Sequence, residues 1–315
     1  MKFIEAHRDF IPANAAFVRR QFRDIRYAPG GEKAPLSHAP DGDRRSLDIY
    51  LPNEGDGPYP VIVDIFGGGW FFGNKSSHKL EPALNLLKRG FAVVSINYSL
   101  SSQEKFPVPV YETKAAIRYV RAHAAEYQLD PNRIALLGES AGAHMATYCA
   151  VTSACHLMQG ENWPNMDVSD AVQAVIAVYC PTDIGLSKEM FTVQQALTGM
   201  PALVQEYGEA DSPEGTYIGG APREKADAYF AANPENFLSK NCPPHLFLHG
   251  SCDQVVPIVG TMAYAAMMMH QIGEENVRFQ VVDGGRHNIL DFEEEWIYDL
   301  EAAFLKEKLG IGKEG

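Results

Sequence analysis

The chain has 315 residues, 46% of them hydrophobic, which is enough to bury one substantial core. Its formal charge of −13, from 27 basic and 40 acidic side chains, gives no electrostatic support for binding nucleic acid. No apolar run approaches the roughly 20 residues that a membrane-spanning helix needs, so we expect no membrane partner. The five cysteines include no CxxC pair, so we expect reduced thiols and no metal site.

The first 22 residues, MKFIEAHRDFIPANAAFVRRQF, mix charged with apolar residues and lack the core of a signal peptide. We therefore expect a cytoplasmic location, with a leader removed before residue 1 as the open alternative. The sequence does not decide the oligomeric state, and a homodimer is compatible with it.

Short β-branched runs alternate with longer helical patterns along most of the chain. Several of the expected strands are apolar with little alternation, which is typical of a parallel sheet covered on both faces. The expected strands are 46–52, 59–66, 90–98, 133–138, 171–180, 245–250 and 277–283. This rhythm predicts an α/β fold with a doubly wound, mostly parallel sheet, helices on both faces, and one domain spanning 1–315.

The rhythm is interrupted between about residues 184 and 240. No clear strand occurs there, and the stretch EYGEADSPEGTYIGGAPREKADAYF is rich in glycine, proline and charge. So long an interruption in a compact domain is usually a functional insertion. We expect a small lid or cap over a pocket, and a surface excursion without a role is the alternative.

The pentapeptide GESAG, residues 138–142, follows the strand RIALLG and precedes a helical pattern. This is a G-x-S-x-G pattern in the strand–turn–helix context that gives it meaning. Glycines on both sides allow a sharp turn that lifts Ser140 clear of the backbone. The pattern therefore predicts Ser140 as a nucleophile.

A serine hydroxyl needs a base, and the base needs an acid that orients it. Asp253 follows the strand HLFLHG, and His287 follows the strand VRFQVVD. In an open α/β sheet the site lies beyond the carboxyl ends of the strands, so Ser140, Asp253 and His287 are expected at the same edge.

Other residues compete for these roles. Asp183, after the expected strand ending at Cys180, is the rival acid. Among the ten histidines, His249 and His144 are interpreted as structural, whereas His78 could line the pocket.

Three consecutive glycines follow the strand YPVIVDIF, in the stretch FGGGWFFG. Attack on an acyl carbon creates an oxyanion that preorganised N–H groups stabilise. The N–H groups of Gly67, Gly68 and Ala141 are the predicted donors. The stretch lacks the GK[ST] of a phosphate loop and the spacing of a dinucleotide fingerprint.

In family order, the chain contains LDIYLP, GGGWFFG, GESAG, CPTDI, PPHLFLHGSCDQVVP and GGRHNI. With these motifs it resembles the α/β-hydrolase superfamily, and more narrowly the HGGG-type carboxylesterases related to hormone-sensitive lipase and to acetyl and feruloyl esterases. The resemblance implies Ser140 as nucleophile, Asp253 as acid and His287 as base, with an oxyanion hole at Gly67, Gly68 and Ala141.

The chain departs from this family at two positions. Phe66 replaces the histidine that usually precedes the glycines, so its packing would have to hold the loop. Arg286 stands beside the base where a small residue is usual. It could recognise an acidic substrate group, although an exposed arginine paired with the acidic surface is the favoured interpretation.

We expect a serine carboxylesterase that hydrolyses short-chain or acetyl esters, including carbohydrate-linked ones, and needs neither a cofactor nor a metal. Trp70, Phe71 and Phe72 follow the glycines and are expected to wall the pocket, together with His78 and Arg286. An amidase or peptidase, such as an aryl formamidase, could use the same triad. A catalytically silent binding protein of the same fold is the alternative from another class.

Overall fold

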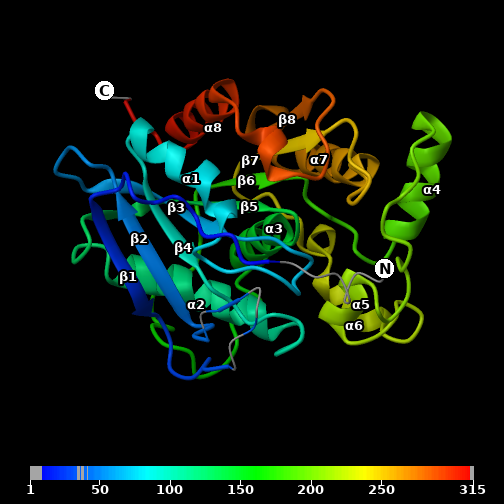
Figure 1. Ribbon diagram of the computed structural model, residues 1–315, viewed down its shortest axis with the longest axis horizontal. Helices are drawn as coiled ribbons and strands as arrows, with labels where there is room; N and C mark the ends of the chain where they lie inside the picture. Colours follow the sequence, from blue (N-terminus) through cyan, green and yellow to red (C-terminus); the bar gives the residue numbers. More distant parts are fainter. Residues whose placement is uncertain (1–8, 34–35, 37–38, 41, 313–315) are drawn as a thin grey trace.

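The computed structural model describes residues 9–33, 36, 39–40 and 42–312. Within these residues one sheet of eight strands lies between two layers of helices (Figure 1). The strands are β1 (Arg20–Arg26), β2 (Ser46–Leu51), β3 (Tyr59–Ile65), β4 (Ala92–Ile96), β5 (Leu129–Glu139), β6 (Ala174–Val178), β7 (His245–Gly250) and β8 (Val277–Val282). The α-helices are α1 (Glu81–Asn85), α2 (Val108–Ala122), α3 (Ala141–Ala154), α4 (Ser187–Thr198), α5 (Pro213–Ile218), α6 (Ala226–Ala232), α7 (Ile258–Ile272) and α8 (Glu295–Lys308).

The strands are ordered β1-β2-β4-β3-β5-β6-β7-β8 in the sheet. From β4 to β8 all neighbours pair in parallel, whereas β2 pairs antiparallel with both β1 and β4. The parallel strands therefore end at one edge of the sheet. Loops that follow β3, β5, β7 and β8 meet at this edge, which is where an open α/β sheet forms its site.

Both faces of the sheet are buried, which explains the nearly continuous apolar strands. In β3, Val61, Val63 and Ile65 belong to the core shared with α2, α3 and α7. Ile62 faces the opposite core, which α8 covers. Figure 1 shows α2 and α3 on one side of the sheet and α1 and α8 on the other.

The predicted fold class is confirmed, and each expected strand is present with slightly different ends. The strand expected at 171–180 covers only Ala174–Val178, and β5 begins earlier than expected, at Leu129. The sequence prediction missed β1, because Arg20–Arg26 is an edge strand whose residues are mostly exposed or only half-buried. It therefore lacks the apolar signal of the inner strands.

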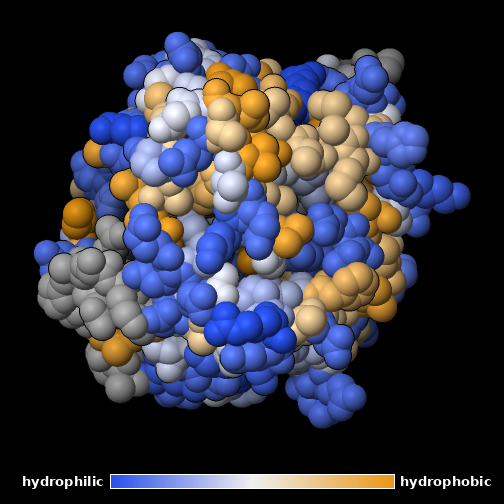
Figure 2. All heavy atoms as spheres, turned by 90° about the vertical axis from the view of Figure 1, so that its right-hand side faces the viewer, coloured by the Kyte–Doolittle hydropathy of each residue, from blue (hydrophilic) through white to orange (hydrophobic). Residues whose placement is uncertain are grey.

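The segment between β6 and β7 carries α4, α5 and α6, which lie beyond the carboxyl ends of the strands (Figure 1). Within it, α4 packs against α7. Figure 2 looks onto this side of the molecule, on which hydrophobic and hydrophilic residues are interspersed. In the described part of the chain, no helix is long and apolar enough to cross a membrane.

Candidate active site

Ser140 stands at a strained turn between β5 and α3. Its backbone has φ 56° and ψ −123°, outside the regions that a non-glycine residue ordinarily adopts. The flanking glycines make this turn sterically feasible. A Cβ on Gly142 would lie 1.9 Å from the Ile65 carbonyl oxygen, and one on Gly138 would lie 2.3 Å from the Gly142 carbonyl oxygen. The turn leaves Ser140 only 8% exposed, at the wall of a cavity.

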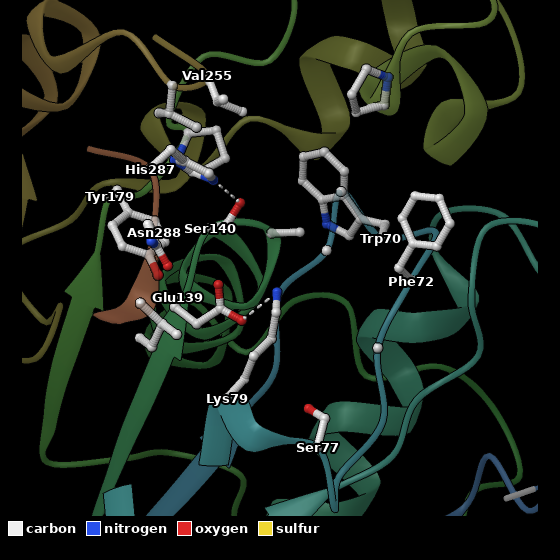
Figure 3. Close-up of a pocket in the computed structure, with 18 of the residues that line it drawn as sticks. Trp70, Phe72, Ser77, Lys79, Glu139, Ser140, Tyr179, Val255, His287 and Asn288 are labelled. Atoms are coloured by element: carbon white, nitrogen blue, oxygen red, sulfur yellow. Dashed lines mark hydrogen bonds and ion pairs between the residues drawn. The ribbon is translucent and has the colours of Figure 1, made fainter. Parts of the chain in front are cut away.

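The structure brings the three predicted triad residues into contact, and Figure 3 shows the contact of Ser140 with His287. Ser140 Oγ lies 2.9 Å from His287 Nε2, and His287 Nδ1 lies 2.8 Å from Asp253 Oδ2. The tertiary arrangement joins a serine after β5, an aspartate after β7 and a histidine after β8. These distances are those of a nucleophile, a base and an orienting carboxylate.

Asp253 is completely buried and well supplied with hydrogen-bond donors. Its Oδ1 accepts from the N–H groups of Val255 and Val256, both at 2.8 Å. Burial by itself would raise the pKa of Asp253, but the charges and hydrogen bonds of His287 and His249 outweigh burial and hold the pKa well below its usual range. The carboxyl is therefore ionised and can orient the base.

His249 contributes more than the structural role expected for it. Its Nε2 lies 3.3 Å from Asp253 Oδ2 and 3.2 Å from the Val256 carbonyl oxygen. It therefore supports the acid from β7, four residues before Asp253 in the chain. The i, i+4 spacing of the two residues was the only sequence signal for this contact.

The rival residues lie elsewhere. Asp183 Oδ1 accepts from Asn233 Nδ2 at 2.8 Å and from the Gly185 N–H, so it is engaged within the insertion. His144 is buried with Nε2 3.0 Å from the Ala232 carbonyl oxygen, and burial lowers its pKa to about 4. This fits the structural interpretation of His144.

The glycine loop after β3 supplies backbone to the cavity, but the first of its N–H groups is already used. Gly67 donates to Glu139 Oε1 at 2.5 Å. The cavity is lined instead by Gly68, Gly69 and Ala141. The predicted donor Gly67 is therefore corrected, because its hydrogen bond commits the N–H to a carboxylate. Gly68 and Ala141 remain candidates, joined by Gly69, which the sequence analysis did not choose.

Phe66, at the position where the resembled family has histidine, is held by Tyr98. The two rings are stacked with centroids 4.4 Å apart, and Tyr98 Oη donates to the Phe66 carbonyl oxygen at 2.8 Å. On the other side, a Cβ on Gly73 would lie 2.3 Å from the Phe66 ring. Packing thus constrains the start of the glycine loop without an imidazole.

Glu139 connects the turn to this loop. It is buried, and its Oε1 accepts from Gly67 and lies 3.1 Å from Lys79 Nζ (Figure 3). Nearby, burial raises the pKa of Asp64 to about 8. A hydrogen bond from Ser95 lowers the pKa of Asp64, whereas the like charge of Glu139 raises it.

A cavity of about 510 Å³ opens over Ser140. Trp70, Phe72 and His78 line it, as expected, but Phe71 does not, which corrects its expected place in the pocket. The chain turns back after Trp70, which has φ 58°, and the N–H groups of Phe71 and Phe72 both bond the Gly68 carbonyl oxygen.

Arg286 is outside this cavity. Its Nε and Nη2 bind the two carboxylate oxygens of Asp291, each at 2.9 Å, and its side chain is 67% exposed. It borders a smaller hollow beside Cys252 and His287. The expected place of Arg286 in the substrate pocket is therefore corrected, and the favoured interpretation as a surface ion pair agrees with the structure.

Fold and site together define an α/β-hydrolase. The BD-FAE family model matches residues 47–268, and the chain belongs to this family. Its relatives include the esterase LipQ of Mycobacterium tuberculosis, 27% identical over 88% of this chain, and the probable carboxylic ester hydrolase LipM of the same organism, 31% identical over 76% of this chain. The matched regions cover 59% of LipQ and 51% of LipM, so the chain corresponds to little more than half of either relative.

Solved structures resemble the chain over nearly its whole length. A truncated carbohydrate esterase from gut microbiota superposes with a TM-score of 0.78 at 27% identity, covering 95% of this chain and 99% of that one. An acetyl ester-xyloside bifunctional hydrolase from Caldicellulosiruptor lactoaceticus has a TM-score of 0.67 at 22% identity and shows likeness of fold alone.

Proposed function

We propose that the chain is a serine carboxylesterase that hydrolyses short-chain or acetyl esters, including esters of saccharides, through an acyl-enzyme. The contact of Ser140, His287 and Asp253 at the wall of one cavity carries this proposal. The esterase names of LipQ and LipM and the carbohydrate esterase neighbour support the reaction class. The mechanism uses only groups of the chain and water.

In the first half-reaction, Ser140 Oγ attacks the ester carbonyl carbon and transfers its proton to His287 Nε2. Asp253 accepts the Nδ1 proton of His287 in a hydrogen bond and stabilises the imidazolium. As the tetrahedral intermediate collapses, the C–O bond to the alcohol breaks and His287 returns the proton to the leaving oxygen. Water then repeats these steps on the acyl-enzyme, releases the carboxylic acid and regenerates Ser140.

The oxyanion of each tetrahedral intermediate needs donors from the backbone beside Ser140. Gly68, Gly69 and Ala141 line the cavity there, and Ala141 begins α3, so its N–H has no acceptor within the helix. We assign the oxyanion to these N–H groups. Donors of this kind are worth about 10²- to 10³-fold in kcat each.

The segment 184–240 is proposed as a lid inserted into this one domain. It brings side chains to the cavity from outside the sheet, namely Ser187, Tyr207, Pro213 and Glu214. A wall of this kind limits the length of the bound acyl or alcohol group. Tyr207→Ala should therefore raise turnover of octanoate relative to acetate, whereas Tyr207→Phe, which keeps the ring, should not.

The test is hydrolysis of p-nitrophenyl esters from acetate to octanoate by the wild type and by Ser140→Ala. Turnover should be greatest for the short esters and should vanish in Ser140→Ala, while the surface control Ser169→Ala stays active. A fluorophosphonate should label the wild type but not Ser140→Ala. A wild type that neither hydrolyses these esters nor is labelled would contradict the proposal, and faster hydrolysis of a matched amide would favour the amidase alternative.

A further inference from the structure

Four residues that line the cavity over Ser140 each carry a buried polar atom that has no hydrogen-bond partner among the described residues. Among the described residues, none provides a partner for Glu214 Oε2, Ser77 Oγ, Trp70 Nε1 or His78 Nδ1. All four residues line the same cavity. Buried polar atoms in native proteins are nearly always hydrogen-bonded, so a group of exceptions around one cavity needs an explanation.

Glu214 is the most unusual of the four. It lies in the short helix α5, is only 3% exposed, and forms no ion pair with a described lysine or arginine. Burial raises the pKa of Glu214 to about 7, although hydrogen bonds from Ser187 and Ser212 to its carboxyl lower the pKa in part. A buried carboxyl without a cation is costly to keep, and such groups concentrate at functional sites.

The neighbours of Glu214 do not satisfy Oε2. Burial raises the pKa of Tyr207 and of Tyr229, and the nearby charge of Glu214 raises both further. However, the Tyr207 hydroxyl donates to the Val255 carbonyl oxygen, and the Tyr229 hydroxyl donates to the Gly220 carbonyl oxygen at 3.2 Å. Both phenols are therefore committed to backbone acceptors, and neither supplies a hydrogen bond to Oε2.

A second residue with an unpartnered polar atom lines the cavity from another part of the chain. Ser77 is only 6% exposed and follows the glycine loop, whereas Glu214 belongs to the insertion. Figure 3 shows Ser77 and Trp70 among the residues that line the cavity. Trp70 Nε1 can only donate a hydrogen bond, whereas a serine hydroxyl can donate or accept.

We propose that Glu214, assisted by Ser77 and Trp70, determines substrate specificity by hydrogen-bonding free hydroxyl groups on the alcohol portion of the ester. This inference rests on the proposed esterase function and assigns the selective residues of its cavity. A hydroxyl suits them because it can donate to a carboxylate and accept from an indole N–H. An ester without hydroxyls would leave the same buried atoms unpaired, and sites built to bond a hydroxyl discriminate strongly against analogues that lack it.

The experiment compares a monoacetylated methyl xyloside with cyclohexyl acetate, two ring esters of the same acid that differ in free hydroxyls. The wild type should prefer the xyloside. Glu214→Leu should lower kcat/KM for the xyloside by about tenfold or more, mainly through KM, and change cyclohexyl acetate by less than about twofold. Glu214→Gln, which can still hydrogen-bond, should retain part of the preference, and Ser77→Ala should show a smaller loss of the same kind.

Glu301→Gln is the matched control. Glu301 is also a 3% exposed glutamate whose Oε2 finds no partner among the described residues, but it lies on α8 and does not line the cavity. Its replacement should leave the preference between the two esters unchanged. Glu214→Leu should unfold at a temperature no lower than the wild type, because it removes a buried carboxyl that has no cation to pair with.

The inference would be overturned if Glu214→Leu lost kcat/KM equally on both esters or kept the wild-type preference for the xyloside. Strong destabilisation of both Glu214 variants would overturn it as well. Each of these results would leave the esterase proposal intact. Absence of hydrolysis of either ester by the wild type, together with no labelling of Ser140, would overturn both. The two failures are therefore distinguishable.

Discussion

Replacing Glu139 by alanine should slow catalysis with little change in KM, because Glu139 fixes the loop that we assign to the oxyanion. In the structure, Glu139 Oε1 accepts from Gly67 N at 2.5 Å and lies 3.1 Å from Lys79 Nζ. The substitution removes one hydrogen bond to a charged acceptor, worth about 1.5–3 kcal/mol. If this energy holds the adjoining Gly68 and Gly69 in position for the transition state, kcat should fall by about 10- to 100-fold.

The assay is steady-state hydrolysis of p-nitrophenyl acetate, with kcat and KM determined separately for each variant. Glu139→Gln keeps an oxygen that can accept from Gly67, so its loss in kcat should be smaller than that of Glu139→Ala. Lys79→Met removes the ammonium but keeps the bond between Gly67 and Glu139. It should therefore affect kcat less than Glu139→Ala does.

Thermal unfolding of each variant separates a local effect on the loop from a loss of the fold. A folded Glu139→Ala variant with kcat within about twofold of the wild type would refute the reasoning. In that case Phe66 and its contacts with Tyr98 would hold the loop without help from the carboxylate.

Three further outcomes are expected. Tyr98→Phe leaves the buried Phe66 carbonyl without its donor and should lower the free energy of unfolding by about 1–2 kcal/mol in urea titration; an unchanged midpoint would contradict this. Gly142→Ala places a Cβ 1.9 Å from the Ile65 carbonyl oxygen, so soluble, fully active protein would be inconsistent with the turn described above. Burial raises the pKa of Glu301 to about 8, so the neutral carboxyl stabilises the folded state below the ordinary pKa of a glutamate, and this stabilisation is lost as pH rises through about 8. The melting temperature of the wild type should therefore fall as pH rises from the ordinary glutamate pKa to about 8, and Glu301→Gln should make this fall smaller. An unchanged dependence of melting temperature on pH would refute the raised pKa of Glu301.

Much of the candidate site could be predicted from local sequence. Ser140 stands between two glycines after an apolar strand, and Asp253 and His287 follow the last two expected strands of the chain. Strand ends in a parallel sheet converge at one edge, so position along the chain was enough to predict that the three residues meet. Conversely, β1 was missed because an exposed edge strand carries no apolar periodicity.

Contacts between distant segments could not be predicted in this way. Gly67 and Glu139 are 72 positions apart, and no pattern indicated that the Gly67 N–H would be taken by that carboxylate. Likewise, no pattern in the sequence separated Phe72, which lines the cavity, from Phe71, which does not. Both results depend on the direction in which a few backbone groups of the glycine loop point. Composition and periodicity carry no information about that direction.

The sequence by itself determined the fold class, the strained turn at Ser140 and the choice of Asp253 and His287, because glycine requirements and strand order are local properties. Only the tertiary structure decided how the site is surrounded. It placed His249 against Asp253, paired Arg286 with Asp291 at the surface, and brought Glu214 from the insertion to the cavity. These placements follow from packing between elements far apart in the chain, where burial and the competition for hydrogen-bond partners select one arrangement.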